Sequence, residues 1–366
     1  MTLLTKTPPD LERKIYQIEQ RDGIFIVIDG QNYLDFSSND YLGLATHPLM
    51  KKATIQAIQQ YGTGSTASRL LSGTYNLHNK LETDIAIFKH KEAALVFNSG
   101  YQANLGLVRT LFNKNDVIFS DKLNHASIID GLKLGEAKYL RFKHNNIEDL
   151  EWLLKKERKK FDRALVITET VFSMDGDIAP LTDIIALKKQ YNLEIMVDEA
   201  HAVGIETPQE IDYIMGTFSK GLGSFGAYFA CSQEIKTYLI NKCRSFIFTT
   251  ALPPGVIAAN ITALEILTSE KERTLKLKKN TEYFRNELKK QGLLPLGETQ
   301  IIPIIIGSEA KALKVANKMR KLGFWVSPIR YPTVAKNQAR LRFSLSFNHT
   351  KEMLAEVIKA SYLLKE

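Results

Sequence analysis

Cysteine and long apolar runs are scarce in this chain of 366 residues, and each scarcity excludes a class of protein. The two cysteines, Cys231 and Cys243, are not spaced as C-x-x-C. We therefore expect neither a disulfide scaffold nor a cysteine zinc site, and a reducing compartment such as the cytoplasm fits. The longest apolar stretches, such as residues 301–306, are far too short to span a membrane, and this one contains Pro303. The N-terminal residues scatter their charges and lack the apolar run of a secretory signal, so no membrane association is expected.

Several motifs of other enzyme classes are missing or incomplete. No H-E-x-x-H motif occurs and the 7 histidines are dispersed, so we expect no metal site. Residues 197–201 read Val-Asp-Glu-Ala-His, like the acidic motif of a helicase, but the phosphate loop ending in Gly-Lys that an ATPase needs is absent. Residues 221–226 match G-x-G-x-x-G, yet they run into the strand-like residues 228–231 instead of opening a helix. Flexible glycines explain this motif better than a dinucleotide site.

Acidic residues are outnumbered by basic ones, 40 against 49, which gives a net charge of +9. The excess is either a solvated basic surface or an attraction to anionic substrates or carriers. Because the basic residues are spread along the chain and form no block, nucleic acid is not expected as a partner.

The middle of the chain alternates between short apolar runs and helical patterns. Such alternation is typical of an α/β fold, with a mostly parallel central sheet and helices on both faces. Ligands of these sheets bind at the loops that follow the carboxyl ends of the strands. The expected strands are residues 94–97, 117–120, 164–168, 195–197, 213–216 and 228–231, and the expected helices are 101–112, 148–159 and 181–190.

The length of the chain and its 44% hydrophobic content predict a globular protein of more than one structural unit. We expect an N-terminal segment (1–40), a large α/β domain (41–268) and a smaller α+β domain (269–366). The elements expected outside the central pattern are helices at 11–20, 48–61 and from Pro254 to about 291, and strands at 24–28, 33–36, 301–306 and 341–345.

Polar residues follow several of the expected strands. Lys220 lies in a loop of small residues, 216–221, where a bulky cofactor can approach the backbone. Asp198 ends an apolar strand, and a carboxylate that is half-buried there needs a cationic partner. The protonated pyridine nitrogen of pyridoxal phosphate is such a partner, and His201 could bond the hydroxyl of its ring. Taken alone, Lys220 could equally be a surface lysine in a turn, and His201 an ordinary loop histidine.

Two other loops suit the remaining parts of the same cofactor. Ser99, Gly100 and Tyr101 join a strand to a helix, and a helix N-terminus offers unpaired N–H groups to a phosphate. The same residues could equally form an ordinary turn between a strand and a helix. His125 follows another expected strand and could stack on the ring, and Ser173 follows the strand that ends near residue 168.

Together these motifs resemble the α-oxoamine synthases, a family of the fold-type I pyridoxal-phosphate enzymes. The resemblance covers nearly the whole chain, and its motifs occur in the order of the family. One departure is the linker at 202–212, which is shorter than in the family and lacks its Gly-Arg-Gly segment. The motifs that carry the resemblance are residues 39–44, 68–73, 124–127, 173–176, 198–201, 217–221, 329–334 and 339–342.

The resemblance implies pyridoxal 5'-phosphate as the cofactor and a role for each part of its site. Lys220 would hold the cofactor covalently and then act as acid and base, and Asp198 would bond the pyridine nitrogen. His201 would bond the ring hydroxyl and His125 would stack on the ring. The other residues that would contact the cofactor, most of them at its phosphate, are Ser99, Gly100, Tyr101, Ser173 and Thr217.

The resemblance also implies substrates and an assembly. Asn39 and Arg342, with Arg330 as a further candidate, would bind the carboxylate of an amino acid. Thr250 would reach the phosphate held by a neighbouring subunit, which implies a homodimer with shared active sites.

Residues 36–41 and 68–73 look most like those of the family members that condense L-alanine with a pimeloyl thioester, carried by coenzyme A or by acyl-carrier protein. Members that use glycine or serine with another acyl-CoA are the alternative within the family. An aminotransferase of the same fold is the alternative in another reaction class, although it gives no reason for the motifs around Asn39 and His125.

Overall fold

The structure is a computed structural model that describes residues 8–365. The contacts within the chain separate two compact units. The large unit comprises Leu44–Phe172 and Ile178–Lys271, and the small unit comprises the residues up to Gly43, Ser173–Asp177 and the residues from Glu272 onward. The domain boundaries expected from the sequence stay a prediction, and each unit is described by itself. No helix among residues 8–365 is both long and apolar enough to cross a membrane.

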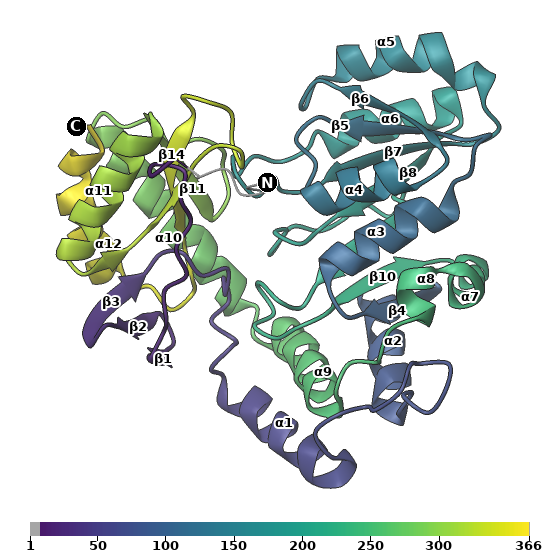
Figure 1. The fold of residues 1–366 in the computed structure, drawn as a ribbon, viewed down its shortest axis with the longest axis horizontal. Helices are drawn as coiled ribbons and strands as arrows, with labels where there is room; N and C mark the ends of the chain where they lie inside the picture. The colour runs from purple at the N-terminus through teal and green to yellow at the C-terminus, as the bar shows by residue number, and fades with distance from the viewer. Residues whose placement is uncertain (1–7, 366) are drawn as a thin grey trace, which may run out of the picture. The chain divides into compact units, whose positions relative to one another are not determined.

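The large unit is built on a seven-stranded sheet (Figure 1). All neighbouring strands pair in parallel except β10, which is antiparallel to both of its neighbours. The mostly parallel sheet expected from the sequence is therefore confirmed. In sheet order the strands are β4 (Ala93–Phe97), β10 (Ala227–Cys231), β9 (Tyr213–Thr217), β8 (Glu194–Asp198), β7 (Ala164–Glu169), β5 (Val117–Asp121) and β6 (Lys138–Phe142).

Both faces of this sheet are buried, as expected for parallel strands between helices. In β7, Leu165 and Ile167 belong to a core cluster that includes residues of α3 and α4, while Val166 on the opposite face is also fully buried. The helices of the large unit are α1 (Pro48–Tyr61), α2 (Asn76–Phe88), α3 (Gly100–Leu111), α4 (Ala126–Leu134), α5 (Ile147–Glu157), α6 (Leu181–Tyr191), α7 (Gln233–Lys242), α8 (Arg244–Ile247) and α9 (Pro254–Ser269).

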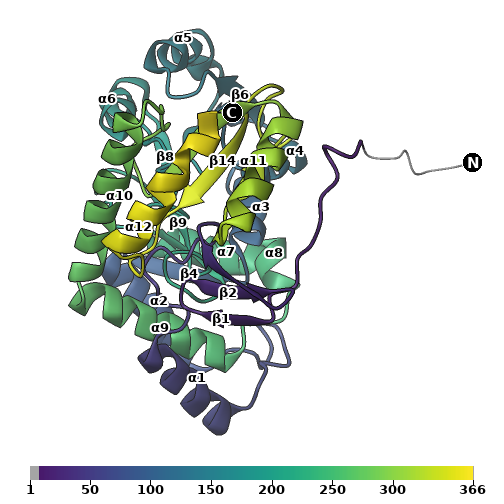
Figure 2. The same cartoon turned by 90° about the vertical axis from the view of Figure 1, so that its left-hand side faces the viewer.

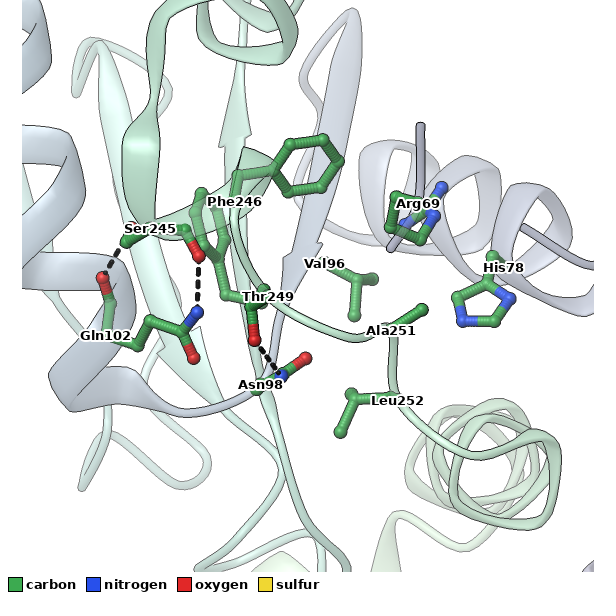
Figure 3. Close-up of a pocket in the computed structure, with 11 residues that line it drawn as sticks. Arg69, His78, Val96, Asn98, Gln102, Ser245, Phe246, Thr249, Ala251 and Leu252 are labelled. Carbon is green, nitrogen blue, oxygen red and sulfur yellow. Dashed lines mark hydrogen bonds between the residues drawn. The ribbon is translucent and has the colours of Figure 1, made fainter. Parts of the chain in front are cut away.

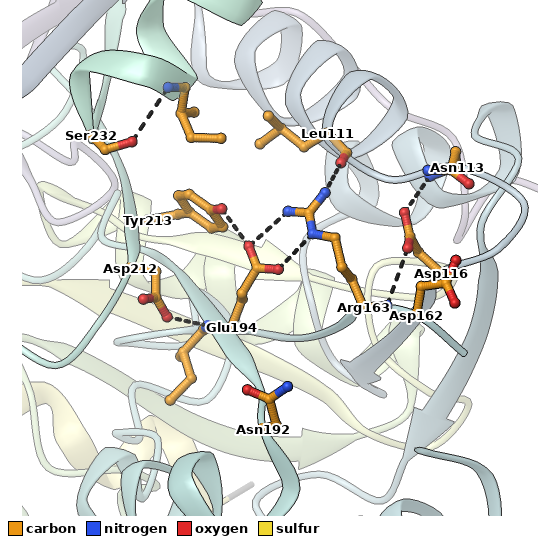
Figure 4. A network of polar contacts seen from close by, with 12 residues as sticks. Leu111, Asn113, Asp116, Asp162, Arg163, Asn192, Glu194, Asp212, Tyr213 and Ser232 are labelled. Atoms are coloured by element: carbon orange, nitrogen blue, oxygen red, sulfur yellow. Dashed lines mark hydrogen bonds and ion pairs between the residues drawn. The ribbon is translucent and has the colours of Figure 1, made fainter. Parts of the chain in front are cut away.

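A polar network joins the amino ends of three central strands (Figure 4). Arg163, just before β7, pairs with both carboxylate oxygens of Glu194 at 2.8 Å, and Glu194 begins β8. The hydroxyl of Tyr213, the first residue of β9, donates to the same carboxylate. The network fixes the strands relative to one another at the end of the sheet opposite to their carboxyl ends.

The small unit contains two further sheets, and α11 packs against strands of both (Figure 2). Phe36, Phe284 and Phe343 form its aromatic centre, with centroid separations of 5.6 to 6.3 Å, and His349 stacks on Phe36. The strands are β1 (Gln20–Asp22), β2 (Phe25–Ile28), β3 (Gln31–Asp35) and β12 (Phe324–Trp325) in one sheet, and β11 (Ile301–Gly307), β14 (Ala339–Ser344) and β13 (Ser327–Ile329) in the other. The helices are α10 (Glu272–Lys290), α11 (Glu309–Lys321), α12 (Lys351–Lys359) and the 3₁₀ helix η2 (Ala360–Lys365), and a further 3₁₀ helix, η1 (Arg158–Lys160), follows α5 in the large unit.

Two expectations from the sequence are wrong. The helix expected at 11–20 is absent, and residues 12–19 have no regular structure before β1 begins. Ile15 and Ile18, which a helix would place on one face, are both exposed, and Tyr16 packs edge-on against Trp325. The long helix expected after Pro254 is two helices, because α9 ends at Ser269 and α10 starts at Glu272.

Candidate active site

The polar residues predicted for the cofactor lie at the carboxyl ends of neighbouring parallel strands. Asp198 is the last residue of β8, and Thr217 is the last residue of β9, three positions before Lys220. Glu169 ends β7 and is the register partner of Asp198, so the two carboxyl side chains project from the same face of the sheet. The sheet therefore brings a lysine and two acidic groups to one edge.

Asp198 is 3% exposed, and both of its oxygens accept hydrogen bonds. Its Oδ2 accepts from Nδ2 of Asn104 in α3 at 2.8 Å, and its Oδ1 accepts from the backbone N–H of Ala200 at 2.9 Å. An ionised carboxylate has about four lone-pair sites, so these two bonds leave it able to accept a further donor, such as a protonated ring nitrogen.

His125 begins α4 as its N-cap residue. Its Nδ1 accepts from the backbone N–H of Ser127 at 3.2 Å and lies 2.7 Å from the Ser127 hydroxyl. The side chain is partly exposed, yet loss of hydration lowers the pKa of His125, with the Asp198 carboxylate opposing the shift and the Lys220 ammonium adding to it. The electrostatic influence of both groups on the pKa of His125 places His125, Asp198 and Lys220 in one cluster.

Glu169 is a member of this cluster that the sequence analysis missed. Burial raises the pKa of Glu169 well above its usual value, the nearby Asp198 carboxylate raises it further, and Lys220 opposes the shift. The buried environment therefore favours the protonated form of Glu169, and a bond from the backbone N–H of His125 opposes this shift. The only signal in the sequence is its position at the end of an apolar strand.

A candidate phosphate site lies at the start of α3. Ser99 is the N-cap residue, and its Oγ accepts from the N–H of Gln102 at 3.2 Å. Among residues 8–365, the buried Oγ1 of Thr217 has no hydrogen-bond partner. A Cβ on Gly100 would lie 2.7 Å from Cγ2 of Thr217, so this position needs glycine. The hydroxyl of Tyr101 donates to Asp130, so Tyr101 would contribute to the site through its backbone.

Thr250 lies beside the segment that leads into α3. Nδ2 of Asn98 donates to the Thr250 carbonyl at 2.8 Å and to the Thr249 hydroxyl at 2.9 Å. A pocket opens next to these residues and is lined by Gln102 and Arg69 among others (Figure 3). The Thr250 side chain is exposed, and it is therefore accessible to a second chain.

His201 and Ser173 complete the set predicted to contact the cofactor. His201 lies in the large unit, directly after Ala200, and is 4% exposed. Ser173 belongs to the small unit, where its carbonyl accepts from Nε of Arg342 at 2.6 Å. The structure thus groups Ser173 with the residues predicted to bind the substrate.

The small unit holds a buried arginine, Arg342, that has no carboxylate partner among residues 8–365. Arg342 is 6% exposed, and Nη1 and Nη2 both donate to Oδ1 of Asn39 at 3.3 Å. Further bonds from Arg342 reach the hydroxyls of Ser344 at 2.6 Å and Tyr41 at 3.4 Å, and no ion pair to it occurs among the described residues. A buried guanidinium without a counter-charge is costly, and the carboxylate of an amino acid would neutralise it.

The other arginines of this region are engaged differently. Arg340, two residues away on the same face of β14, forms an ion pair with Asp175. Arg330 donates to the backbone carbonyls of Asp10 at 2.5 Å and Glu12 at 3.1 Å. Arg342 is therefore a better candidate than Arg330 for binding a substrate carboxylate.

The described residues of the large unit fit pyridoxal phosphate. The fit rests on three features: a lysine in a cluster with a buried acceptor carboxylate, a buried threonine hydroxyl without a partner, and a helix N-terminus next to it. In the part of the chain that the structure describes, no group of three His, Cys, Asp or Glu side chains could hold a metal ion.

Comparisons with known proteins agree with this fit. The family "Aminotransferase class I and II" matches residues 31–360. The 8-amino-7-oxononanoate synthase of Geobacter sulfurreducens is 44% identical over 96% of this chain and 93% of its own length. That of Citrifermentans bemidjiense is 45% identical over 94% of this chain and 92% of its own length.

Solved structures show the same fold. A serine palmitoyltransferase variant from S. paucimobilis with a bound PLP–myriocin aldimine has a TM-score of 0.91 and 30% identity, and the match covers 96% of this chain and 93% of that one. The 8-amino-7-oxononanoate synthase of Francisella tularensis has a TM-score of 0.76 and 31% identity, covering 91% of this chain and 96% of that one. The chain therefore belongs to the class I and II aminotransferase family and, within it, to the pyridoxal-phosphate-dependent α-oxoamine synthases.

Proposed function

We propose that the chain joins L-alanine to a pimeloyl thioester, with release of carbon dioxide and the thiol, to form 8-amino-7-oxononanoate for biotin biosynthesis. The observation that carries this proposal is the similarity to 8-amino-7-oxononanoate synthases, which runs over more than nine-tenths of the chain at 43–45% identity. When bound, pyridoxal phosphate supplies an electron sink for the carbanion that forms at the α-carbon of the amino acid.

Lys220 is the proposed site of covalent attachment and the proposed base. Its Nζ would take the α-proton of alanine and later return a proton to the product. Asp198 would keep a positive charge on the pyridine nitrogen, since its buried carboxylate favours a cationic neighbour. His201 would bond the ring hydroxyl, and His125 would stack on the ring.

The phosphate would be bound by the start of α3 and by the end of β9. The N–H groups of Ser99, Gly100 and Tyr101 belong to the first turn of α3 and its cap, where intrahelical partners are lacking. The hydroxyl of Thr217 would find a partner in a phosphate oxygen.

Arg342 and Asn39 would bind the carboxylate of the amino acid. Oδ1 of Asn39 already accepts from both Nη atoms of Arg342, which is the position that a carboxylate oxygen would take in a two-point contact. Binding would neutralise a guanidinium that is buried without a counter-charge.

We also propose a homodimer in which Thr250 reaches the phosphate in the neighbouring subunit, because Thr250 is exposed beside the segment that leads into α3. The two cysteines are free thiols, which supports a location in the cytoplasm. The acyl donor would be pimeloyl-CoA or pimeloyl-acyl-carrier protein, both of them anionic and suited to a chain with a net charge of +9.

A substrate matrix tests the proposal. Pimeloyl, acetyl, succinyl and palmitoyl thioesters are each offered with alanine, glycine and serine, and thiol release and the ketone product are measured. We expect the pimeloyl thioester with alanine to give the highest kcat/KM. A preference for glycine with an acetyl or succinyl donor would refute the biotin assignment and leave the family assignment intact.

An aminotransferase is the second candidate, because the matched family is named for that reaction. It would transfer the amino group of alanine to a 2-oxo acid and release no thiol. Thiol release that depends on alanine, together with no amino transfer to a panel of 2-oxo acids, would decide against it.

A further inference from the structure

Asn104, on α3, lies between two groups assigned to the site. Its side-chain amide donates to Oδ2 of Asp198 at 2.8 Å and to the hydroxyl of Ser127 at 3.0 Å. The Ser127 hydroxyl lies 2.7 Å from Nδ1 of His125. A continuous line of hydrogen bonds therefore runs from the Asp198 carboxylate through Asn104 and Ser127 to the His125 ring.

The direction of each bond in this line is determined by the chemistry of its ends. An ionised carboxylate only accepts, so the amide of Asn104 must turn its NH₂ group toward Asp198. The second N–H of the same group then donates to Oγ of Ser127, which leaves the Ser127 hydroxyl proton for Nδ1 of His125. The backbone N–H of Ser127 also donates to Nδ1, at 3.2 Å. Nδ1 therefore accepts, and the neutral ring carries its proton on Nε2.

We propose that Asn104 is a positioning residue that links Asp198 to His125 through Ser127 and holds the His125 ring neutral, with Nε2 as its hydrogen-bond donor. The proposal rests on the roles proposed above for Asp198 and His125. It assigns a function to a side chain that touches neither the substrate nor the reacting atoms.

A role in folding alone would not explain this asparagine. Asn104 is 1% exposed, and its Oδ1 has no hydrogen-bond partner within residues 8–365. A buried polar atom without a partner lowers stability, and an apolar side chain of similar size would avoid that cost. Both N–H groups of the amide, in contrast, donate hydrogen bonds, one to Asp198 and one to Ser127.

The charged groups near His125 set the expected direction of change. Asp198 and Asp130 favour its protonated form, whereas Lys220 opposes it. The hydroxyl of Ser127 stabilises the neutral ring by donating to Nδ1. Without Asn104, the Ser127 hydroxyl is no longer committed as a donor, and the Asp198 carboxylate loses one of its two bonds. Both changes favour protonation, so removal of Asn104 should raise the pKa of His125.

The test compares Asn104→Leu and Ser127→Ala with the wild-type holoenzyme. Ring ¹⁵N NMR gives the tautomer and the pKa of His125, assigned by the signal that disappears in His125→Asn, and kcat/KM is measured against pH. We expect both variants to raise the pKa of His125 by about one unit and to move the acid limb of kcat/KM by the same amount, which corresponds to a roughly tenfold loss of kcat/KM at acidic pH.

Asn280→Ala is the matched control, because Asn280 is a largely buried asparagine of the small unit whose Nδ2 donates to the His349 carbonyl at 2.8 Å. This control should lower the unfolding temperature without moving the pKa of His125. An unchanged His125 pKa and acid limb in Asn104→Leu would overturn the proposal, and so would an Nδ1-protonated ring in the wild type. If Asn104→Leu does not fold, an unchanged His125 pKa in Ser127→Ala would overturn the proposal in its place.

This result is separable from the proposed function. The tautomer and the pKa of His125 are measured without an acyl donor, so a wild-type protein that rejects pimeloyl thioesters would refute the substrate assignment and leave the Asn104 measurement valid.

Discussion

The change Arg342→Lys tests the proposed carboxylate site of the small unit. The guanidinium of Arg342 has five N–H donors in a fixed plane, and four acceptors surround it: the Ser173 carbonyl, Oδ1 of Asn39 and the hydroxyls of Ser344 and Tyr41. An ammonium group keeps the charge but has three donors around a single point. It could contact one carboxylate oxygen of an amino acid but could not bind both oxygens as a planar fork does.

The expected effect follows from the loss of one charge-assisted hydrogen bond. Such a bond contributes about 1.5–3 kcal/mol. Because each 1.36 kcal/mol is a factor of ten, the KM for alanine should rise roughly 10- to 150-fold. The cofactor content should not change, since Arg342 belongs to a different unit from Lys220 and Thr217.

The assay is thiol release at saturating acyl thioester, with alanine varied. Arg340→Lys is the control on the same face of β14, because Arg340 is also buried but is already paired with Asp175. We expect Arg340→Lys to lower stability and leave the KM for alanine within about twofold of the wild type. An unchanged KM in Arg342→Lys refutes the reasoning, and a raised KM in Arg330→Lys would move the carboxylate site to Arg330.

Three other predictions concern the cofactor and the core. Lys220→Ala should retain no pyridoxyl group after borohydride reduction, as checked by peptide mass; a group trapped on another lysine would contradict the assignment. Asp198→Asn should fold normally and lose activity by a factor of about 10² or more, because the charge opposite the ring nitrogen is lost; near-normal turnover would contradict its role. His349 is buried with a pKa of about 3, against 6.5 when unfolded. The unfolded state therefore takes up its proton first as the pH falls, and the free energy of unfolding should decrease by about 2 kcal/mol between pH 7 and pH 5 through this group. Urea unfolding at both pH values should show a smaller decrease in the free energy of unfolding in His349→Leu than in the wild type. Equal decreases in the two proteins would refute the assignment of this pH dependence to His349.

The six strands predicted in the large unit were all found, because strands that are buried on both faces read as apolar runs. The missed strand, β6, lies at an edge of the sheet. Its residues include Lys138 and Arg141, both exposed, so its sequence carries no apolar run. The helix predicted at 11–20, in contrast, has a sequence signal but does not form. Its composition suits a helix, but no tertiary surface binds one face of it, and short helices are marginal without packing.

The site, like the fold, was predicted only where the sequence carries a local signal. Lys220 and His125 stand in loops next to apolar strands, and Asp198 begins the Asp-Glu-Ala-His motif at the end of one, so each was singled out from the sequence. The structure brings all three into one cluster. Asn104 lies in the middle of a helix and Glu169 at the end of a strand, so neither is marked by a motif. Only the register of β7 against β8, and the packing of α3, reveal that both contact or adjoin Asp198.

Two acidic residues, Glu169 and Asp198, lie in the same cluster as Lys220. Register partners at the ends of neighbouring parallel strands lie close together, so two ionised carboxylates there would repel each other strongly. The two carboxyl groups have different surroundings. Asp198 accepts two hydrogen bonds, from the side chain of Asn104 and from the backbone N–H of Ala200, whereas burial raises the pKa of Glu169. The surroundings of Glu169 thus favour its neutral form, while Asp198 can still accept a further donor, such as the ring nitrogen that we propose for it. Two neighbouring carboxyl groups in different environments are a pattern found in acid–base enzymes. If Asp198 binds the ring nitrogen as proposed, Glu169 in its neutral form would not replace the lost charge, so loss of the Asp198 carboxylate should abolish most of the activity.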